Sequence, residues 1–325
     1  MRRSLAVPLA IVALAGATAA QAWNATGHQI VAAAAYRALP GPAREWVDVV
    51  LRDHPDYTRW VEACDIDDVG LYVFMKASPW PDEIRRSGSP FDHAEWHYVN
   101  YPLRAPDFAI EPRPEPGNDI IFGLMCSHDI VEGRVTERTR AVIGDRVPTA
   151  VERAAHLAWL VHLVADIHQP LHCTAFFSDP YPEGDAGGNL FCVRDGDRPV
   201  KLHAFWDDAV GLTERTMRLL GRAGKMAADP ELARAKLPEL ERDTTPEAWA
   251  LESRQVAVDS VYLRGELSGA RAESYRDADG RLRSRPPADA PPLPPGYQDE
   301  ARRVSLRRLA LAAFRLEDEL RGLGG

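Results

Sequence analysis

The 325-residue chain has little cysteine and no excess of basic residues. Four cysteines are too few to hold a fold of this size together, and none of them forms a Cys-x-x-Cys pair typical of thiolate zinc sites. Arginine and lysine number 39 against 48 aspartates and glutamates, which gives a net charge of -9. This balance argues against a protein that packages DNA or binds anionic membranes through its overall charge, so a polyanion partner would need a local positive site.

Internal repeats and interior low-complexity linkers are also missing, and no apolar run after the first 22 residues could span a bilayer. Hydrophobic residues make up 45% of the chain and charged residues 27%, a composition that can bury a sizeable core. One domain over residues 23–325 is therefore the expectation.

The first 22 residues have the pattern of a signal peptide. Arg2 and Arg3 precede an apolar stretch, and Ala20-Gln21-Ala22 is a small-x-small cleavage site. The stretch is shorter than the roughly 20 residues of a membrane anchor, which disfavours that alternative. We expect an exported protein, secreted or periplasmic, whose mature chain starts at Trp23.

An even number of cysteines in an exported chain favours disulfides over metal thiolates. We favour a pair between Cys173 and Cys192 across a glycine-rich loop, which leaves Cys64 with Cys126. The sequence does not prove this connectivity.

Helical patterns dominate the chain, so the predicted class is mainly α with a minor strand or hairpin. The apolar spacing in residues 148–167, with Thr149 as a cap and Glu152 three positions later, predicts the clearest helix. Other helices are expected over residues 27–39, 42–52, 245–264 and in the C-terminal stretch up to Leu323. We expect one strand at residues 96–101, a loop or short hairpin at 178–198, and a surface loop at the proline-rich residues 266–296.

Two His-x3-Asp pairs carry the clearest chemical signal. His162 and Asp166 lie four positions apart on the long helix and therefore share one face, and His203 and Asp207 repeat that spacing. Imidazole nitrogen and carboxylate oxygen are donors that zinc accepts besides thiolate. A single such pair is more often a core histidine and a capping acid, but here His172 follows the first pair closely, just after Pro170.

Further donors lie upstream. Asp82 and His97 sit in segments rich in aromatic residues, where the alternative is a solvated acid or a core-edge histidine. Cleavage after Ala22 would free the α-amino group of Trp23, which can chelate a metal together with its own carbonyl oxygen. His28 lies five residues further on, at the start of the first predicted helix.

Together these residues resemble the trinuclear zinc nucleases. That family includes fungal and plant single-strand-specific nucleases and 3′-nucleotidases and shares a helical fold with bacterial zinc-dependent phospholipase C. The resemblance extends from Trp23 to about Leu323 and rests on the N-terminal Trp with Gly-His, the His-x3-Asp-x5-His run, Gly-Gly-Asn at 187–189 and the second His-x3-Asp. It implies three Zn²⁺ ions: one held by Asp82, His97, His162 and Asp166, one by Trp23, His28 and Asp166, and one by His172, His203 and Asp207.

The resemblance also implies roles in catalysis and substrate binding. Asp82, Asp166 and Arg85 would be catalytic, with Arg85 balancing charge in the transition state, although a surface salt bridge is the alternative for it. Asn100 stands where the fungal enzymes have an aspartate that grips a base edge, so base preference should differ. The remaining substrate contacts would be Tyr98, Tyr101, Gly188, Asn189 and Asp208, and the two tyrosines could equally be core strand residues.

The implied function is an exported zinc-dependent endonuclease that cleaves single-stranded DNA and RNA to 5′-phosphate products and also acts on 3′-nucleotides. It requires neither a stable protein partner nor a membrane. Two alternatives stay open: a phospholipase C of the same fold, and an exported zinc-binding protein without catalysis. We expect His156 and His168 to be structural, and we assign no role to His54, His93 or His128.

Overall fold

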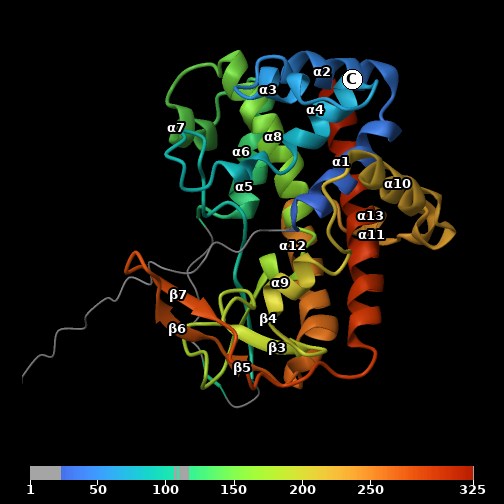
Figure 1. Ribbon diagram of the computed structural model, residues 1–325. Helices are drawn as coiled ribbons and strands as arrows, with labels where there is room; N and C mark the ends of the chain where they lie inside the picture. The colour runs from blue at the N-terminus through green and yellow to red at the C-terminus, as the bar shows by residue number, and fades with distance from the viewer. Residues whose placement is uncertain (1–22, 106–107, 110–116, 325) are drawn as a thin grey trace, which may run out of the picture.

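The computed structural model describes residues 23–105, 108–109 and 117–324, and the predicted signal peptide lies outside them. Helices dominate, which confirms the predicted mainly α class (Figure 1). The helices are α1 (Ala25–Ala38), α2 (Gly41–Leu51), α3 (Tyr57–Glu62), α4 (Val69–Ala77), α5 (Trp80–Glu83), α6 (Ile120–Val131), α7 (Glu137–Ile143), α8 (Ala150–Asp166), α9 (Leu202–Asp207), α10 (Thr216–Ala228), α11 (Glu239–Arg242), α12 (Pro246–Val256) and α13 (Tyr297–Gly324). Short 3₁₀ turns lie at Pro170–His172, Pro230–Leu232, Arg234–Lys236 and Leu263–Gly265, and one π-helical turn at Ala257–Val261.

Helix α8 forms as its sequence predicts. The Thr149 side chain accepts a hydrogen bond from the Glu152 amide, and the Glu152 side chain accepts one from the Thr149 amide, which completes a capping box. From Ala154 to Asp166 every residue is buried, because α1, α2, α6 and α13 pack around this helix. Asp166 is the last residue of α8, and the turn Pro170–His172 follows within four residues.

The strands are short and lie mostly in the lower part of the molecule as drawn in Figure 1. Strand β1 (Tyr101–Arg104) runs parallel to β2 (Thr174–Phe177). A three-stranded sheet has the order β4 (Arg198–Lys201), β3 (Phe191–Asp195), β5 (Ala270–Arg271), and β6 (Glu273–Arg276) and β7 (Leu282–Arg285) form a separate antiparallel hairpin.

The buried apolar residues form two large clusters. The first is built from helices α1, α2, α4, α6, α8, α10 and α13 around residues such as Trp159 and Leu309. The second lies between α9, the β3–β4 hairpin and the start of α13 around Trp206 and Tyr262. Among the described residues, no helix is both long and apolar enough to cross a membrane.

The strand predicted at residues 96–101 begins only at Tyr101. Trp96 is buried in the first cluster, where its ring stacks on His93 at 3.8 Å, and Val99 donates its amide to the His172 carbonyl. Packing of Trp96 in the core, and not hydrogen bonding to a neighbouring strand, therefore determines the backbone path of Trp96–Asn100. In the segment predicted as a surface loop, 266–296, the structure forms β5 and the β6–β7 hairpin.

Both predicted disulfides are contradicted, because Cys64, Cys126, Cys173 and Cys192 are all free thiols. Cys173 packs in the first apolar cluster and donates to the Ile167 carbonyl, whereas Cys192 lies on β3 in a small separate cluster with Ala272 and Ala290. Cys126 is buried on α6 and donates to the Arg138 carbonyl, and the half-buried Cys64 donates to the Ile66 carbonyl. Each thiol therefore fills a local position of its own.

Candidate metal centre

Asp166, at the end of α8, lies at the centre of a buried group of histidines. Its Oδ2 atom is 3.0 Å from His162 Nε2 and 3.1 Å from His97 Nδ1, and those two nitrogens are 2.9 Å apart. Asp82, on the short helix α5, brings its Oδ1 within 3.7 Å of His97 Nδ1. Four donor atoms from three separate segments of the sequence therefore lie close together.

These separations match the edges of a zinc site. Bonds of 2.0–2.1 Å in tetrahedral geometry put neighbouring ligand atoms about 3.3 Å apart. The four separations given above range from 2.9 to 3.7 Å and bracket this value, so the donor atoms are spaced as zinc ligands are.

The other oxygen of Asp166 points towards a second group. Oδ1 is 3.2 Å from His28 Nε2, and the His28 ring stacks on the His162 ring at 4.1 Å. Trp23 is fully buried just ahead of α1, and Asn24 caps that helix by accepting the Gly27 amide. A carboxylate with its two oxygens on different histidines has the arrangement expected of a bridging ligand.

A third group consists of His172, His203 and Asp207. His203 Nε2 is 3.5 Å from Asp207 Oδ2 across one turn of α9, and the His172 and His203 rings lie 5.1 Å apart. His172 Nδ1 is also 3.7 Å from Asp166 Oδ2, so this group adjoins the first one. All three side chains are buried.

Main-chain carbonyls fix three of these rings. The Nδ1 atoms of His162, His172 and His203 lie 2.8, 2.6 and 2.6 Å from the carbonyl oxygens of Ser78, His97 and Gly187. A carbonyl only accepts, so each Nδ1 carries the proton and Nε2 is the lone-pair atom turned to the cluster. Such carbonyl contacts are the usual outer support of metal-binding histidines.

A glycine makes one of these contacts feasible. Gly187 has φ of +61°, and a Cβ at this position would lie 2.5 Å from the Leu171 carbonyl oxygen. Glycine adopts this conformation without strain and needs no space for a Cβ. Its backbone can therefore bring the Gly187 carbonyl oxygen to His203 Nδ1.

Electrostatics favour the neutral, metal-binding state in His28 and His97, whereas in His162 the neighbouring Asp166 outweighs burial and raises the pKa. Burial, with the nearby His162, lowers the pKa of His28 to about 4, and burial lowers the pKa of His97 to about 3. Burial also raises the pKa of Asp82 to about 6 and that of Asp207 well above its ordinary range. Burial alone would raise the pKa of Asp166. The neighbouring His162 and His172 outweigh burial and hold the pKa of Asp166 well below its ordinary range.

The cluster also contains buried polar atoms that no described residue satisfies. Buried donors and acceptors almost always find a partner, so several orphans in one place point to a missing group. They include His28 Nδ1, His97 Nε2, His172 Nε2 and Asp82 Oδ1, and also His28 Nε2 and Asp166 Oδ1, which lie 3.2 Å apart without forming a hydrogen bond. Nitrogen and carboxylate donors in this number fit zinc.

The residues predicted on the substrate side are placed differently. The Arg85 side chain is 12% exposed and lies 3.6 Å from Asp82, and Tyr98, next to His97, is 38% exposed. Asn100 and Tyr101 are half-buried at the start of β1.

The predicted residues of the glycine-rich loop and of α9 bond to their own surroundings. Gly188 lies in the loop behind His203, and its φ is +79°. The Asn189 amide donates to the Ala186 carbonyl, and Asp208 Oδ1 accepts a hydrogen bond from Asn24.

Sequence reasoning missed two residues that support the cluster. Buried Gln169 donates to Asp207 Oδ1 at 2.6 Å and accepts the Leu171 amide at 2.6 Å, so it links the third group to the turn that carries His172. Asn24 donates to the Asp207 carbonyl and to Asp208 Oδ1, both at 2.9 Å, and thereby ties the start of α1 to the end of α9. Gln169 stands inside the His-x3-Asp-x5-His run, a position that could have drawn attention to it.

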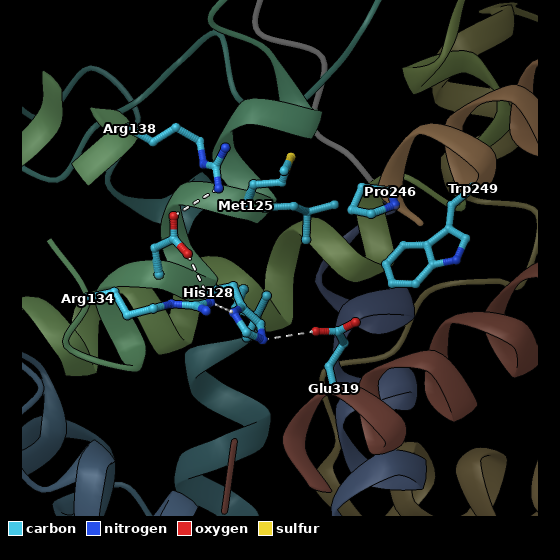
Figure 2. Close-up of a pocket in the computed structure, with 10 residues that line it drawn as sticks. Met125, His128, Arg134, Arg138, Pro246, Trp249 and Glu319 are labelled. Atoms are coloured by element: carbon cyan, nitrogen blue, oxygen red, sulfur yellow. Dashed lines mark hydrogen bonds and ion pairs between the residues drawn. The ribbon is translucent and has the colours of Figure 1, made fainter. Parts of the chain in front are cut away.

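One more set of metal-type side chains lies away from this cluster, with His128 and Asp129 on α6 and Glu132 just after it. Figure 2 shows His128, with Arg134 and Glu319, beside a cavity of about 180 Å³ that is also lined by Met125, Pro246 and Trp249. Arg134 donates to His128 Nδ1 at 2.9 Å and pairs with both acids, and Glu319 from α13 faces the other ring nitrogen at 3.6 Å. Arginine occupies the place of a cation here, so this set is a surface ion-pair network.

The chain is mainly helical, and its buried cluster of five histidines and three aspartates contains several groups of side chains that could hold a divalent metal. Residues 23–323 match the family described as S1/P1 Nuclease, and the chain belongs to that family. This confirms the resemblance seen in the sequence.

Curated relatives are distant. The chain is 24% identical to Endonuclease 3 of Arabidopsis thaliana over 202 residues, 61% of this chain and 62% of that protein. It is 27% identical to Endonuclease 1 of the same plant over 212 residues, 64% of this chain and 60% of that protein. The chain thus spans about three fifths of the length of these relatives.

Proposed function

We propose that this protein is a zinc-dependent endonuclease that hydrolyses single-stranded DNA and RNA to 5′-phosphate products and also removes phosphate from 3′-nucleotides. Membership of a nuclease family supports the phosphodiester chemistry. The observation that carries the proposal is the meeting of Asp82, His97, His162 and Asp166 at ligand distances, with Asp166 also on His28.

We assign three zinc ions to three ligand sets. The first set is Asp82, His97, His162 and Asp166; the second is Trp23, His28 and Asp166; the third is His172, His203 and Asp207. Zinc bound in such sites acts as a Lewis acid on phosphate oxygens and lowers the pKa of a bound water towards neutrality. The positive charge of the ions would also provide the local cationic target that an acidic protein otherwise lacks.

The side chains around the cluster have separate tasks in this proposal. The carbonyl-bound rings of His162, His172 and His203 keep their Nε2 lone pairs in place during turnover. Arg85, already held beside Asp82, offers a planar pair of donors to the phosphate oxygens as negative charge builds up. Tyr98 presents an exposed ring on which a base can stack, with Asn100 close by for a base edge.

The direct test is metal analysis of the purified protein together with activity assays. We expect three zinc ions per chain and cleavage of single-stranded DNA and RNA, with loss of both after chelation and recovery on adding zinc. In a parallel assay with phosphatidylcholine, lipid cleavage without nucleic acid cleavage would establish the phospholipase C alternative. Three bound zincs without hydrolysis of any phosphoester would establish the non-catalytic one.

The role of Trp23 depends on export and processing. We propose that removal of residues 1–22 on the way to the periplasm or the exterior frees the Trp23 amine, which then serves as a ligand together with its carbonyl oxygen. A chain with a tag fused directly before Trp23 should bind about one zinc fewer, because an amide nitrogen is a poor donor. Trp23→Ala with a free amine is the matched control and should keep the zinc; equal zinc content in tagged and processed chains would contradict the role.

A further inference from the structure

The glycine-rich loop that contains Gly187 also contains a fully buried aspartate, Asp185. Asp185 Oδ1 accepts a hydrogen bond from the Phe176 amide at 2.9 Å, and Oδ2 accepts one from the Tyr262 hydroxyl at 2.6 Å. The Asp185 amide in turn donates to the Phe176 carbonyl at 3.0 Å. Asp185 therefore joins the loop to strand β2 and to the residue that follows the π-helical turn.

Strand β2 comes shortly after the turn that carries His172. That turn ends at His172, β2 begins two residues later, and Phe176 stands four residues after His172. The loop also packs directly against the turn, because a Cβ on Gly187 would lie 2.5 Å from the Leu171 carbonyl oxygen. The hydrogen bonds between Asp185 and Phe176 therefore fix the loop to the segment of His172.

The same loop holds His203 through two backbone carbonyls. The Gly187 carbonyl oxygen accepts the proton of His203 Nδ1 at 2.6 Å, and the Gly188 carbonyl oxygen accepts the His203 amide at 3.2 Å. These carbonyls belong to the residues two and three positions after Asp185. The position of the loop therefore sets the position of His203 relative to His172.

The loop has an unfavourable backbone conformation. Residues 186–188 have successive φ values of +55°, +61° and +79°, and the first of them, Ala186, has a Cβ that makes this region costly. Asp185 directly precedes them, so its hydrogen bonds hold the start of this turn. Burial raises the pKa of Asp185 to about 6, and the Tyr262 hydroxyl and the Phe176 amide counteract burial. The carboxylate is therefore ionised at neutral pH and can hold both donors in spite of its burial.

We propose that Asp185 is a positioning residue for the third group: by joining the loop to β2, it sets the spacing of His172 and His203 at which that group takes up zinc. The proposal rests on the proposed nuclease function, which assigns a zinc ion to this group, and adds a side chain that acts through the backbone. Without the Asp185 carboxylate the loop should relax from its left-handed conformation, and the carbonyl that orients His203 should move with it. Zinc binding should then weaken in the third group alone.

Three variants test this role at different strengths. Asp185→Ala removes both acceptor oxygens, and zinc affinity in the third group should fall roughly tenfold. Asp185→Asn keeps an oxygen for the Phe176 amide and can donate to the Tyr262 oxygen, so it should restore most of the affinity. Tyr262→Phe removes one hydrogen bond and leaves Asp185 in place, so its effect should lie between those of the other two.

The matched control is Asp48→Ala. Asp48 on α2 accepts the hydroxyl of buried Tyr36 on α1 at 2.9 Å, so these residues form a second tyrosine–aspartate pair. Removing this carboxylate takes away a comparable hydrogen bond. It should lower the midpoint of urea unfolding without changing the order in which the zinc ions are released.

Zinc release is measured by competition with a chromogenic chelator, and the zinc of the third group is the one that His203→Ala lacks. Cleavage of single-stranded DNA is measured at limiting and at excess zinc. Asp185→Ala should regain the wild-type kcat in excess zinc, which a general loss of folding would prevent. If Asp185→Ala does not fold, the shift in Tyr262→Phe decides.

Unchanged release of this zinc in Asp185→Ala and Tyr262→Phe, or an equal shift in Asp48→Ala, would overturn the proposal. So would a wild-type protein that takes up no zinc in the third group. If the wild-type protein binds this zinc but cleaves no phosphoester, the nuclease proposal fails, and the order of zinc release still decides the role of Asp185.

Discussion

The Asp166-centred group and the group of His172, His203 and Asp207 lie side by side but are held in different ways. Around Asp166 the ligands contact one another, with four separations of 2.9 to 3.2 Å among Asp166, His28, His97 and His162. In the other group the closest contact of each ligand is to a non-ligand atom, from a carbonyl or from Gln169. In the first group only His162 has a shorter contact outside the ligands, at 2.8 Å to the Ser78 carbonyl, so contacts among the ligands dominate there and contacts with the surroundings dominate in the second group.

The aspartates of the two groups also differ in the direction of their pKa shifts. Asp166 is surrounded by histidines, which keep its carboxylate ionised in spite of burial. Asp207 is buried with one amide donor, and burial raises its pKa well above the ordinary range. We infer that the Asp166 group retains its geometry best when a metal is absent, and that the other group depends most on outer support. The predictions below test that difference.

The largest effect is expected from Asp166→Asn. This change removes one negative charge from the atom pair that faces His28, His97 and His162, so two of the three proposed zincs should be lost. Loss of several kcal/mol of transition-state stabilisation corresponds to a fall in rate of roughly a thousandfold or more. Zinc content and turnover are measured on the same sample, and a variant that keeps both would show that Asp166 does not bridge.

A smaller effect is expected from His203→Ala, which touches only the third group. We expect the loss of about one zinc and a fall in activity of roughly a hundredfold, with the Asp166 group still loaded. If this variant instead loses as much zinc as Asp166→Asn, the two groups fill together and the contrast between them disappears.

Much of the Asp166 group could be predicted because it depends on local pattern. The four-residue spacing places His162 and Asp166 on one face of α8, and Thr149 and Glu152 mark where that helix starts. The mainly α class follows from the same periodicity. The family resemblance then added Asp82, His97 and His28, which no local pattern joins to α8.

What the sequence did not predict depends on contacts between distant segments. Gln169 matters because Asp207, 38 residues away, folds back onto it, and Asn24 because Asp208 lies beside it across 184 residues. The three-stranded sheet pairs Phe191 with Arg271, which no alternation pattern marks. The disulfide prediction was wrong because an even cysteine count carries no information about which apolar cluster each thiol enters.

The outer support of the third group is tested by Gln169→Leu. Without the amide, Asp207 Oδ1 loses its 2.6 Å donor, and zinc affinity in this group should fall roughly 10- to 100-fold. The measurement is competition with a chromogenic chelator, in which one zinc should leave early and the others at the wild-type rate. Gln29→Leu, at a buried glutamine that bonds the Ala25 carbonyl in its own helix, is the control. Uniform release of all zincs would contradict a local role.

The smallest effect concerns His156, a buried histidine of α8 outside the cluster, whose Nδ1 lies 3.3 Å from Ser127 Oγ. Burial lowers its pKa from 6.5 to about 3, so between these values the unfolded chain binds a proton that the folded protein does not. Stability is therefore lost as pH falls below 6.5, by up to about 1.4 kcal/mol per pH unit from this residue. His156→Gln keeps a partner for Ser127 but cannot titrate, so urea unfolding should show a correspondingly shallower loss of stability between pH 6.5 and 5.5. Zinc content at neutral pH should stay as in the wild type, and above pH 7 the two pH profiles should run parallel. An unchanged slope below pH 6.5 would show that His156 is protonated in the folded protein as readily as in the unfolded chain.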